Sequence, residues 1–281
     1  MDRGRFSIIG FDSAWTDKPK APGAVCIIRS SMDEKLSYVE PQLASFAQAL
    51  DIINRECELT ELCLVAIDQP TIVPNLTSLR PVDRIAGSLI SWIGGGVQPA
   101  NRSKTGMFDD NAPIWRFKEA LEAVEDPEAA RRAITGLYLI EVFPALALAG
   151  LNSAFCDRLK GPRYNPVRRK TFQLTHWHSV IETIRHFGTL AAIEQIEDWC
   201  DITGSLLLPR KADQDKLDSM ICALIGLHWL TAPREQSMMI GDLETGYMIA
   251  PCIDGVHDRI VAKARENGVL INGATVLVSG I

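Results

Sequence analysis

At residues 6–12 the chain reads FSIIGFD, a largely apolar run that ends in Asp12. A second run, LCLVAID at residues 62–68, ends in Asp68. An ionised carboxylate at the end of a buried strand costs free energy unless it has a partner, a metal or a chemical role. Ligands bind at the carboxyl ends of strands in open α/β sheets, so we expect the two acids to share one crevice.

The segments around these runs predict an α/β fold. Short strands over 23–29 and 35–40 favour a meander, and the unbroken apolar run over 62–67 indicates a central strand covered on both faces. We expect residues 1–281 to form a single domain, with a helical and loop insertion over about 71–136 and a C-terminal extension over about 234–281. The other expected elements are helices over 43–53, 81–92, 115–124, 127–134, 212–230 and 254–267, helical pattern over 171–200, and strands over 137–143, 238–240 and 246–249.

The composition excludes several classes of protein. A hydrophobic fraction of 47% and a charged fraction of 23% are typical of a globular protein, and a net charge of −6 means that nucleic-acid binding would need a local basic patch. Seven scattered cysteines without a CxxC motif fit the reducing cytoplasm and argue against a disulfide framework or structural zinc. The apolar segment 134–151 contains Glu141, so we expect strand, turn and helix there and no membrane span.

Further acids extend the candidate site. Glu141 interrupts the strand expected over 137–143, and Asp218 borders the apolar stripe of the helix expected over 212–230. Asp215 lies three residues before Asp218 on the same side of that helix. Converging carboxylates cannot all ionise without a cation, and sites with only oxygen ligands favour Mg²⁺ or Mn²⁺. Each acid alone is also compatible with a turn, a helix cap or an ion pair, but the whole set favours a metal site.

Five short motifs occur in a fixed order along the chain: GFDSAW at 10–15, IDQP at 67–70, RPVDR at 80–84, EVFP at 141–144 and DKLDS at 215–219. The ordered set resembles domain of unknown function 429, a family regarded as predicted nucleases with a ribonuclease H-like fold. The resemblance implies a mixed five-stranded sheet flanked by helices, with the first three strands antiparallel and the fourth beside the first. It also implies the following metal ligands: Asp12, Asp68, Glu141 and Asp218, with Asp215 in reserve.

Basic residues in two loops are candidate contacts for phosphate. Residues 157–170 carry six Lys and Arg against one acid, and other arginines flank the glycine-rich loop over 94–113. Such a basic patch can bind a phosphate backbone. The alternative interpretation is that these residues form an ordinary solvent-exposed loop. The candidate phosphate-binding residues are Arg80, Arg102, Lys160, Arg163, Arg168, Arg169 and Lys170.

These features together predict a cytoplasmic nuclease dependent on Mg²⁺ or Mn²⁺, with a nucleic acid of unspecified type as its partner. The predicted catalytic residues are Asp12, Asp68, Glu141 and Asp218. Two alternatives stay open. One is a phosphotransferase or ATPase of the actin and sugar-kinase type, although Trp15 stands where the phosphate-binding hairpin of those proteins carries Gly and Thr. The other is a non-catalytic nucleic-acid-binding scaffold. The sequence leaves the oligomeric state open.

Overall fold

Two parallel strands at the centre of the sheet bring the first two aspartates to one edge. The computed structural model describes residues 4–33, 35–252 and 254–275. Strand β1 (Phe6–Asp12) pairs in parallel with β4 (Leu62–Ile67), in a register that sets Phe11 beside Ile67. The residues that follow this pair are therefore neighbours, which confirms that Asp12 and Asp68 leave the sheet at the same edge.

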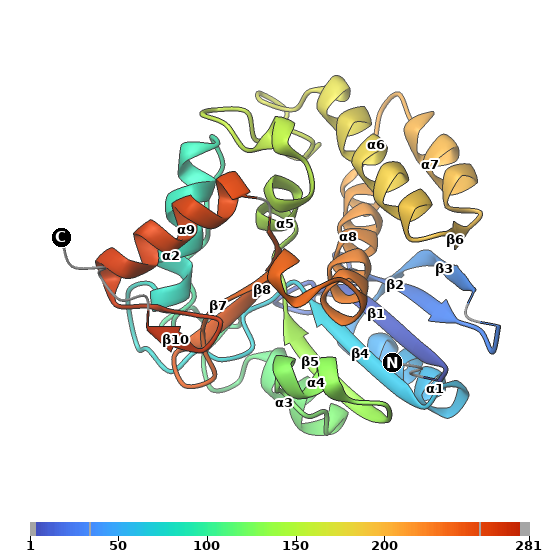
Figure 1. Ribbon diagram of the computed structural model, residues 1–281, viewed down its shortest axis with the longest axis horizontal. Coiled ribbons are helices and arrows are strands. Elements are labelled where there is room, and N and C mark those ends of the chain that lie inside the picture. Colours follow the sequence, from blue (N-terminus) through green and yellow to red (C-terminus); the bar gives the residue numbers. More distant parts are fainter. Residues whose placement is uncertain (1–3, 34, 253, 276–281) are drawn as a thin grey trace.

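The main sheet is mixed and has six strands in the order β5-β4-β1-β2-β3-β6 (Figure 1). From β1 the chain continues antiparallel through β2 (Gly23–Ser30) and β3 (Leu36–Ala44), whereas β5 (Gly136–Glu141) is parallel to β4. This order confirms the expected meander and the position of the fourth strand beside the first. The expected count of five is too low by one, because β6 (Ile193–Glu194) pairs with β3 and two residues give no periodic signal.

Helices flank this sheet and fill the connections between its strands (Figure 1). In the described residues they are α1 (Phe46–Leu59), α2 (Pro81–Trp92), α3 (Pro113–Leu121), α4 (Pro127–Arg132), α5 (Pro144–Leu151), α6 (Leu174–Leu190), α7 (Ile196–Gly204), α8 (Lys211–Thr231) and α9 (Asp254–Asn267), with 3₁₀ turns at Ser153–Phe155 and Arg234–Gln236.

The two faces of the central strands belong to different hydrophobic cores. Ile8 and Leu64 pack in the core that includes α8, whereas their neighbours Ile9 and Val65 pack in the core that includes α1 and α3. This alternation follows from the two-residue period of a strand. All six residues of β4 are buried, as expected for a central strand covered on both faces.

Helix α8 approaches β1 so closely that a side chain at Gly10 would not fit. A Cβ atom at Gly10 would lie 2.1 Å from the carbonyl oxygen of Ser219 and 2.3 Å from the backbone nitrogen of Ala223. Glycine is therefore required two residues before Asp12 because of the contact with α8, not because of its own backbone conformation. This contact brings the polar positions of α8 close to the end of β1.

A smaller antiparallel sheet has the strand order β10-β9-β7-β8 and lies beside α2 and α9 (Figure 1). A third hydrophobic core joins α2 and α5 to this sheet and to α9, so the segment between β4 and β5 packs on the C-terminal segment. The expected strand pair and last helix are confirmed. The strands are β7 (Ser237–Asp242), β8 (Gly246–Pro251), β9 (Leu270–Ile271) and β10 (Ala274–Thr275).

Expected and observed boundaries differ most clearly in two segments. The strand expected to end at residue 40 continues through Pro41 to Ala44, and the helix then begins after Ser45. Ser45 and Gln48 form a reciprocal capping box that fixes this start. The helical pattern over 171–200 is also divided, because Ala192 and Gln195 adopt left-handed backbone angles on either side of β6.

Among the described residues, no helix combines the length and the hydropathy that a bilayer crossing requires. The segment 134–151 forms β5 and α5, as the sequence predicts.

Candidate functional site

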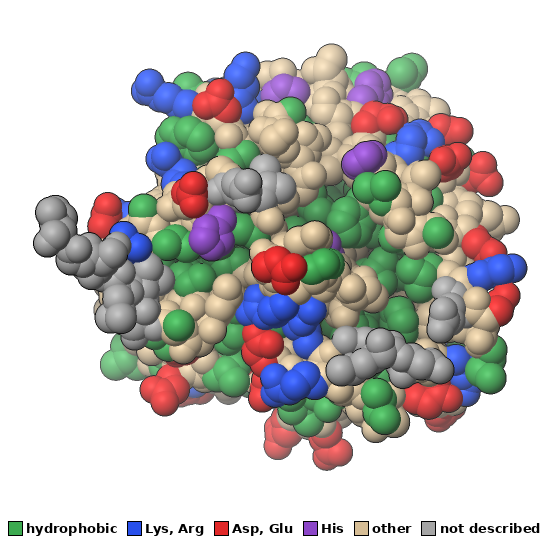
Figure 2. Space-filling model, viewed as in Figure 1, with side chains coloured by type: hydrophobic (Ala, Val, Ile, Leu, Met, Phe, Trp, Pro, Cys, Tyr) green, Lys and Arg blue, Asp and Glu red, His purple; other side chains and the backbone are tan. Residues whose placement is uncertain are grey.

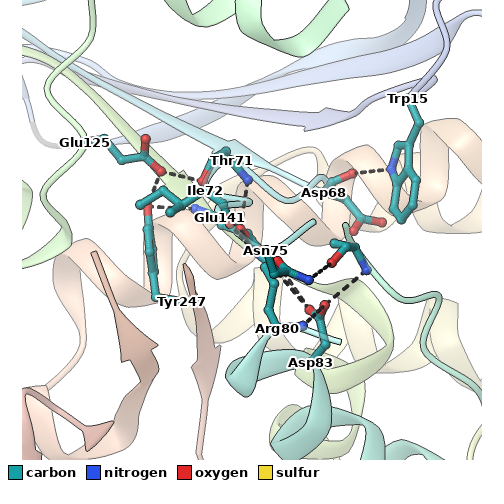
Figure 3. Close-up of polar contacts among 11 residues, drawn as sticks. Trp15, Asp68, Thr71, Ile72, Asn75, Arg80, Asp83, Glu125, Glu141 and Tyr247 are labelled. Atoms are coloured by element: carbon teal, nitrogen blue, oxygen red, sulfur yellow. Dashed lines mark hydrogen bonds and ion pairs between the residues drawn. The ribbon is translucent and has the colours of Figure 1, made fainter. Parts of the chain in front are cut away.

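The turns after β1 and β4 are bonded to each other. The indole nitrogen of Trp15 donates a hydrogen bond of 3.0 Å to the backbone oxygen of Asp68 (Figure 3). The hydroxyl of Ser13 donates one of 2.5 Å to Oε1 of Gln69. Trp15 also makes an edge contact with the ring of Phe108. These contacts hold the carboxylates of Asp12 and Asp68 at the sheet edge, and they give Trp15 a structural role in the turn.

Asp218 reaches the same region from α8. Its Oδ1 accepts a hydrogen bond of 2.7 Å from the hydroxyl of Tyr164, and its Oδ2 accepts one of 2.8 Å from Nε2 of Gln214. One turn earlier on the helix, Asp215 pairs with Lys211. The side chains of Asp12 and Asp218 are buried and that of Asp68 is half-buried.

Burial and mutual repulsion disfavour the ionised forms of these three acids. The pKa of Asp12 is raised well above its ordinary value by burial, then by Asp218 and Asp68. Burial also raises the pKa of Asp68, with Asp218 and Glu141 adding to the effect. The pKa of Asp218 is raised to about 6 by burial, against the opposing effects of Tyr164 and Lys211. The three aspartates therefore form one coupled group whose negative charge is not fully balanced. We call Asp12, Asp68 and Asp218 the aspartate cluster.

The ligand chemistry of the aspartate cluster fits a divalent cation, but its side chains are not grouped as a preformed metal site. Throughout the described residues, no three His, Cys, Asp or Glu side chains stand ready to bind a metal ion. Both oxygens of Asp218 already accept hydrogen bonds, and Asp215 is paired with Lys211. Because carboxylates repel one another in the absence of a cation, the side chains would have to turn toward an ion for it to bind.

Glu141 belongs to a second acidic group and is bound to an arginine. Nη1 of Arg80 lies 2.9 Å from Oε2 of Glu141, Nη2 lies 2.6 Å from Oε1, and Nη2 also lies 2.7 Å from Oδ1 of Asp83 (Figure 3). Burial raises the pKa of Glu141 to about 7, although Arg80 opposes this effect. We call Arg80, Asp83 and Glu141 the arginine cluster.

The arginine cluster brings together two of the predicted site residues, Arg80 and Glu141. The side chain of Arg80 is fully buried and is directed to two carboxylates, so it is not placed to contact a phosphate group. Both oxygens of Glu141 are bound by the same buried guanidinium, so the chain itself supplies the positive charge that balances Glu141. Sequence spacing gave no sign of this pairing, because the two residues are 61 positions apart.

A cavity of about 630 Å³ opens in front of the aspartate cluster, and all three aspartates line it. Its basic lining residues are Lys20, Arg168 and Lys211. A second cavity, of about 360 Å³, adjoins it and is lined by Asp68, Asp218, Arg163 and Arg168 among others. The acids therefore lie where two cavities meet.

Only part of the predicted phosphate-binding set lies at these cavities. Arg163 and Arg168 line them, whereas Lys160, Arg169 and Lys170 are exposed and absent from both linings as far as the described residues show. The guanidinium of Arg102 lies 4.6 Å from the ring centre of Trp115, away from both. Figure 2 shows Lys and Arg side chains gathered at the upper left, over the loop between α5 and α6.

Comparison with family models matches residues 10–242 to a family described as protein of unknown function, DUF429. The chain belongs to the DUF429 family. No curated protein and no solved structure matches the chain. The DUF429 stretch includes the aspartate cluster and the arginine cluster, and it ends with the last residue of β7.

Three residues of the DUF429 stretch that contact the acids were missed as site residues from the sequence: Tyr164, Lys211 and Gln214. Lys211 and Gln214 each lie four residues before their acidic partner on α8, so helical spacing offered a signal. Tyr164 is 54 residues from Asp218, and only the folded chain brings the two together.

Proposed function

We propose that this DUF429 protein is a nuclease that hydrolyses phosphodiester bonds with Mg²⁺ or Mn²⁺ held by Asp12, Asp68 and Asp218. The observation that carries the proposal is the convergence of three aspartates with raised pKa values on one cavity, without a buried basic partner for their charge. Glu141 is left out of the metal ligands because the buried guanidinium of Arg80 already balances its charge. Asp215 stays in reserve, since its partner Lys211 is over half exposed and such a pair is weak.

The fold supports the same proposal. A meander of three antiparallel strands, followed by two parallel strands beside the first, is the arrangement that a ribonuclease H-like fold implies, and the order β5-β4-β1-β2-β3 agrees with it. The acids then come from the first strand, the fourth strand and the last helix on the main sheet. The small sheet and α9 would be an addition to that core.

The residues around the aspartates suit a negatively charged substrate. When bound, a divalent ion supplies Lewis-acid stabilisation of a phosphate and lowers the pKa of water. The chain itself contributes oxygen ligands from the aspartates, and positive charge from Lys20, Lys211 and Arg168 along the cavity. Tyr164 and Gln214 orient Asp218 by their hydrogen bonds, so they act as positioning residues.

The test is cleavage of labelled single-stranded DNA, RNA, a hybrid duplex and a four-way junction with Mg²⁺ or Mn²⁺. We expect Asp12→Asn, Asp68→Asn and Asp218→Asn each to lower the cleavage rate by about 100-fold or more, because each removes charge at the site of the reaction. Asp110→Asn is the matched control, since the Asp110 side chain is 92% exposed. Unchanged cleavage by a folded Asp12→Asn protein would contradict the proposal.

One observation favours the scaffold alternative: within the part of the chain that the structure describes, no metal-binding group of three side chains is preformed. A non-catalytic scaffold would bind an oligonucleotide equally well in wild type and Asp12→Asn, with no calorimetric signal for Mn²⁺ in the presence of that oligonucleotide. The phosphotransferase alternative gains nothing from the structure, because Trp15 fills the turn after β1 and bonds to the backbone of Asp68.

A further inference from the structure

The second cavity adjoins the first at the aspartates. The residues that line both cavities include Asp68, Arg168, Gln214 and Asp218, so these side chains form part of the boundary between them. A substrate whose reacting group lies at the aspartates would therefore be able to extend into either cavity. A cleaved phosphodiester bond has a nucleotide on each side, so the residues that line the second cavity indicate which group could bind next to the bond.

The two cavities differ in their balance of charge. The first is lined by six acids, Asp12, Asp68, Asp83, Glu141, Asp215 and Asp218, and by three basic residues, Lys20, Arg168 and Lys211. In the second, the two shared aspartates are matched by two arginines, Arg163 and the shared Arg168. The second cavity is therefore less acidic than the first, and an anionic group would be better accommodated there, beside the arginines.

The start of α5 adds one hydrogen-bond donor, the amide of Ala145, to the second cavity. Pro144 and Ala145 line it, and no side chain caps this helix. The amide of Ala145 lies in the first turn, where amides have no partner within the helix and favour anions. The helix start and the two arginines thus act on the same space.

The segment that carries Arg163 is fixed in place on both sides. The amide of Gly161 donates a hydrogen bond of 2.8 Å to the backbone oxygen of Ile93, next to the glycine-rich loop. The contact is close, because a Cβ atom at Gly161 would lie 2.9 Å from Ile93. On the other side, Tyr164 donates its hydroxyl to Asp218. Arg163 therefore stands on a segment tied to the aspartate cluster, not on a free loop.

Gln214 gives independent evidence that a ligand belongs at the boundary. The residue is 7% exposed and lines both cavities, and its Nε2 is bound to Asp218. Its Oε1 is buried and has no hydrogen-bond partner within the described residues. A buried carbonyl without a donor is costly, so a ligand that offers a hydroxyl or amino group next to the aspartates would relieve that cost.

We propose that the second cavity is the subsite for the nucleotide that flanks the cleaved bond, and that it binds this nucleotide's phosphate through Arg163, Arg168 and the start of α5. The inference rests on the proposed nuclease function and specifies the substrate. A cavity of about 360 Å³ admits one nucleotide and not a base-paired duplex, so the substrate class is single-stranded nucleic acid.

The first experiment measures binding of thymidine 5′-monophosphate to the full chain by calorimetry in EDTA, with thymidine as the comparison. We expect the double variant Arg163→Ala, Arg168→Ala to weaken binding of the monophosphate at least tenfold. The matched control is Arg169→Ala, Lys170→Ala, which removes the same charge from exposed positions outside both cavities and should change binding less than twofold. Equal weakening by the two pairs, or no binding by wild type, would overturn the subsite.

The second experiment tests whether the second cavity selects single-stranded over double-stranded nucleic acid, beyond a general attraction for negative charge. An eight-nucleotide single strand should lose at least tenfold in affinity in the Arg163→Ala, Arg168→Ala variant, whereas binding of a blunt hairpin duplex should be weak and unaffected. A duplex that binds as tightly and with the same dependence on both arginines would overturn the single-strand assignment.

Failure of the subsite and failure of the nuclease proposal can be told apart. If Asp12→Asn abolishes cleavage while the arginine pair alters neither monophosphate binding nor KM, the nuclease proposal stands and the subsite is wrong. If the monophosphate binds through the arginines in EDTA but no Mn²⁺ binds even with the oligonucleotide present, the nuclease proposal fails and the phosphate site stands.

Discussion

The aspartate cluster and the arginine cluster are two groups of buried acids at the same edge of one sheet, and they differ in where their positive charge comes from. In the arginine cluster a fully buried guanidinium contacts both Asp83 and Glu141 at distances of 2.6 to 3.1 Å. In the aspartate cluster the nearest cation is Lys211, whose side chain is 54% exposed and paired with Asp215.

This difference separates a structural group from a candidate functional one. A buried carboxylate that has its own cation and hydrogen bonds needs nothing from solution, and such a network connects α2 to β5. The aspartate cluster carries negative charge that the chain does not fully balance. Its ionised state becomes favourable when a cation arrives from solution, and this is a property of a binding site.

The largest expected effect comes from breaking the arginine cluster. Arg80→Ala leaves two buried carboxylates without a partner, so we expect the free energy of unfolding to fall by about 3–5 kcal/mol, measured by urea denaturation. Arg5→Ala is the control, because Arg5 pairs with Glu61 at the surface and such pairs contribute about 0–1 kcal/mol. A loss of under about 1 kcal/mol for Arg80→Ala would mean that the guanidinium is not structural.

A smaller effect of opposite sign is expected in the aspartate cluster. Because the pKa of Asp218 is raised to about 6, ionisation of this residue destabilises the folded state as the pH rises through 6. Asp218→Asn does not ionise, so in EDTA we expect it to be more stable than wild type at pH 8, by up to about 3 kcal/mol.

The control for Asp218→Asn is the same comparison at lower pH. Below about pH 3 the side chain is protonated in the folded and the unfolded chain, so the advantage of the variant should disappear there. Urea denaturation of both proteins at pH 8 and at acidic pH gives the answer. A variant that is less stable than wild type at pH 8 would indicate that the charge of Asp218 is already balanced.

The smallest expected effect is stabilisation by a metal ion. At ten times its dissociation constant, Mn²⁺ should stabilise wild type at pH 8 by about 1.4 kcal/mol, and less at pH 5 where the acids are protonated. Asp12→Asn should lose this stabilisation, whereas Asp83→Asn should keep it because Asp83 belongs to the arginine cluster. Thermal unfolding with and without Mn²⁺ measures this stabilisation. An equal loss of stabilisation in both variants would remove the distinction between the clusters.

Local sequence signals were sufficient for the central strands and for α8. The buried runs that end in Asp12 and Asp68 are short-range features, and the period of a strand or helix follows from backbone geometry alone. The start of α1 was also encoded locally, by Ser45 and Gln48, but the pattern of apolar residues placed it too early. The two-residue strand β6 exists only through its pairing with β3, so its own residues give no signal.

The sequence by itself determined which acids stand at strand ends and on the inner side of the late helix, because these positions depend on spacing along the chain. Only the tertiary structure decided which of them are neutralised. Glu141 meets Arg80 across 61 residues, while Asp218 meets Tyr164 across 54 and receives no buried cation. Compensation of charge depends on distance in space and on burial, and neither quantity is written in the spacing of residues along the chain.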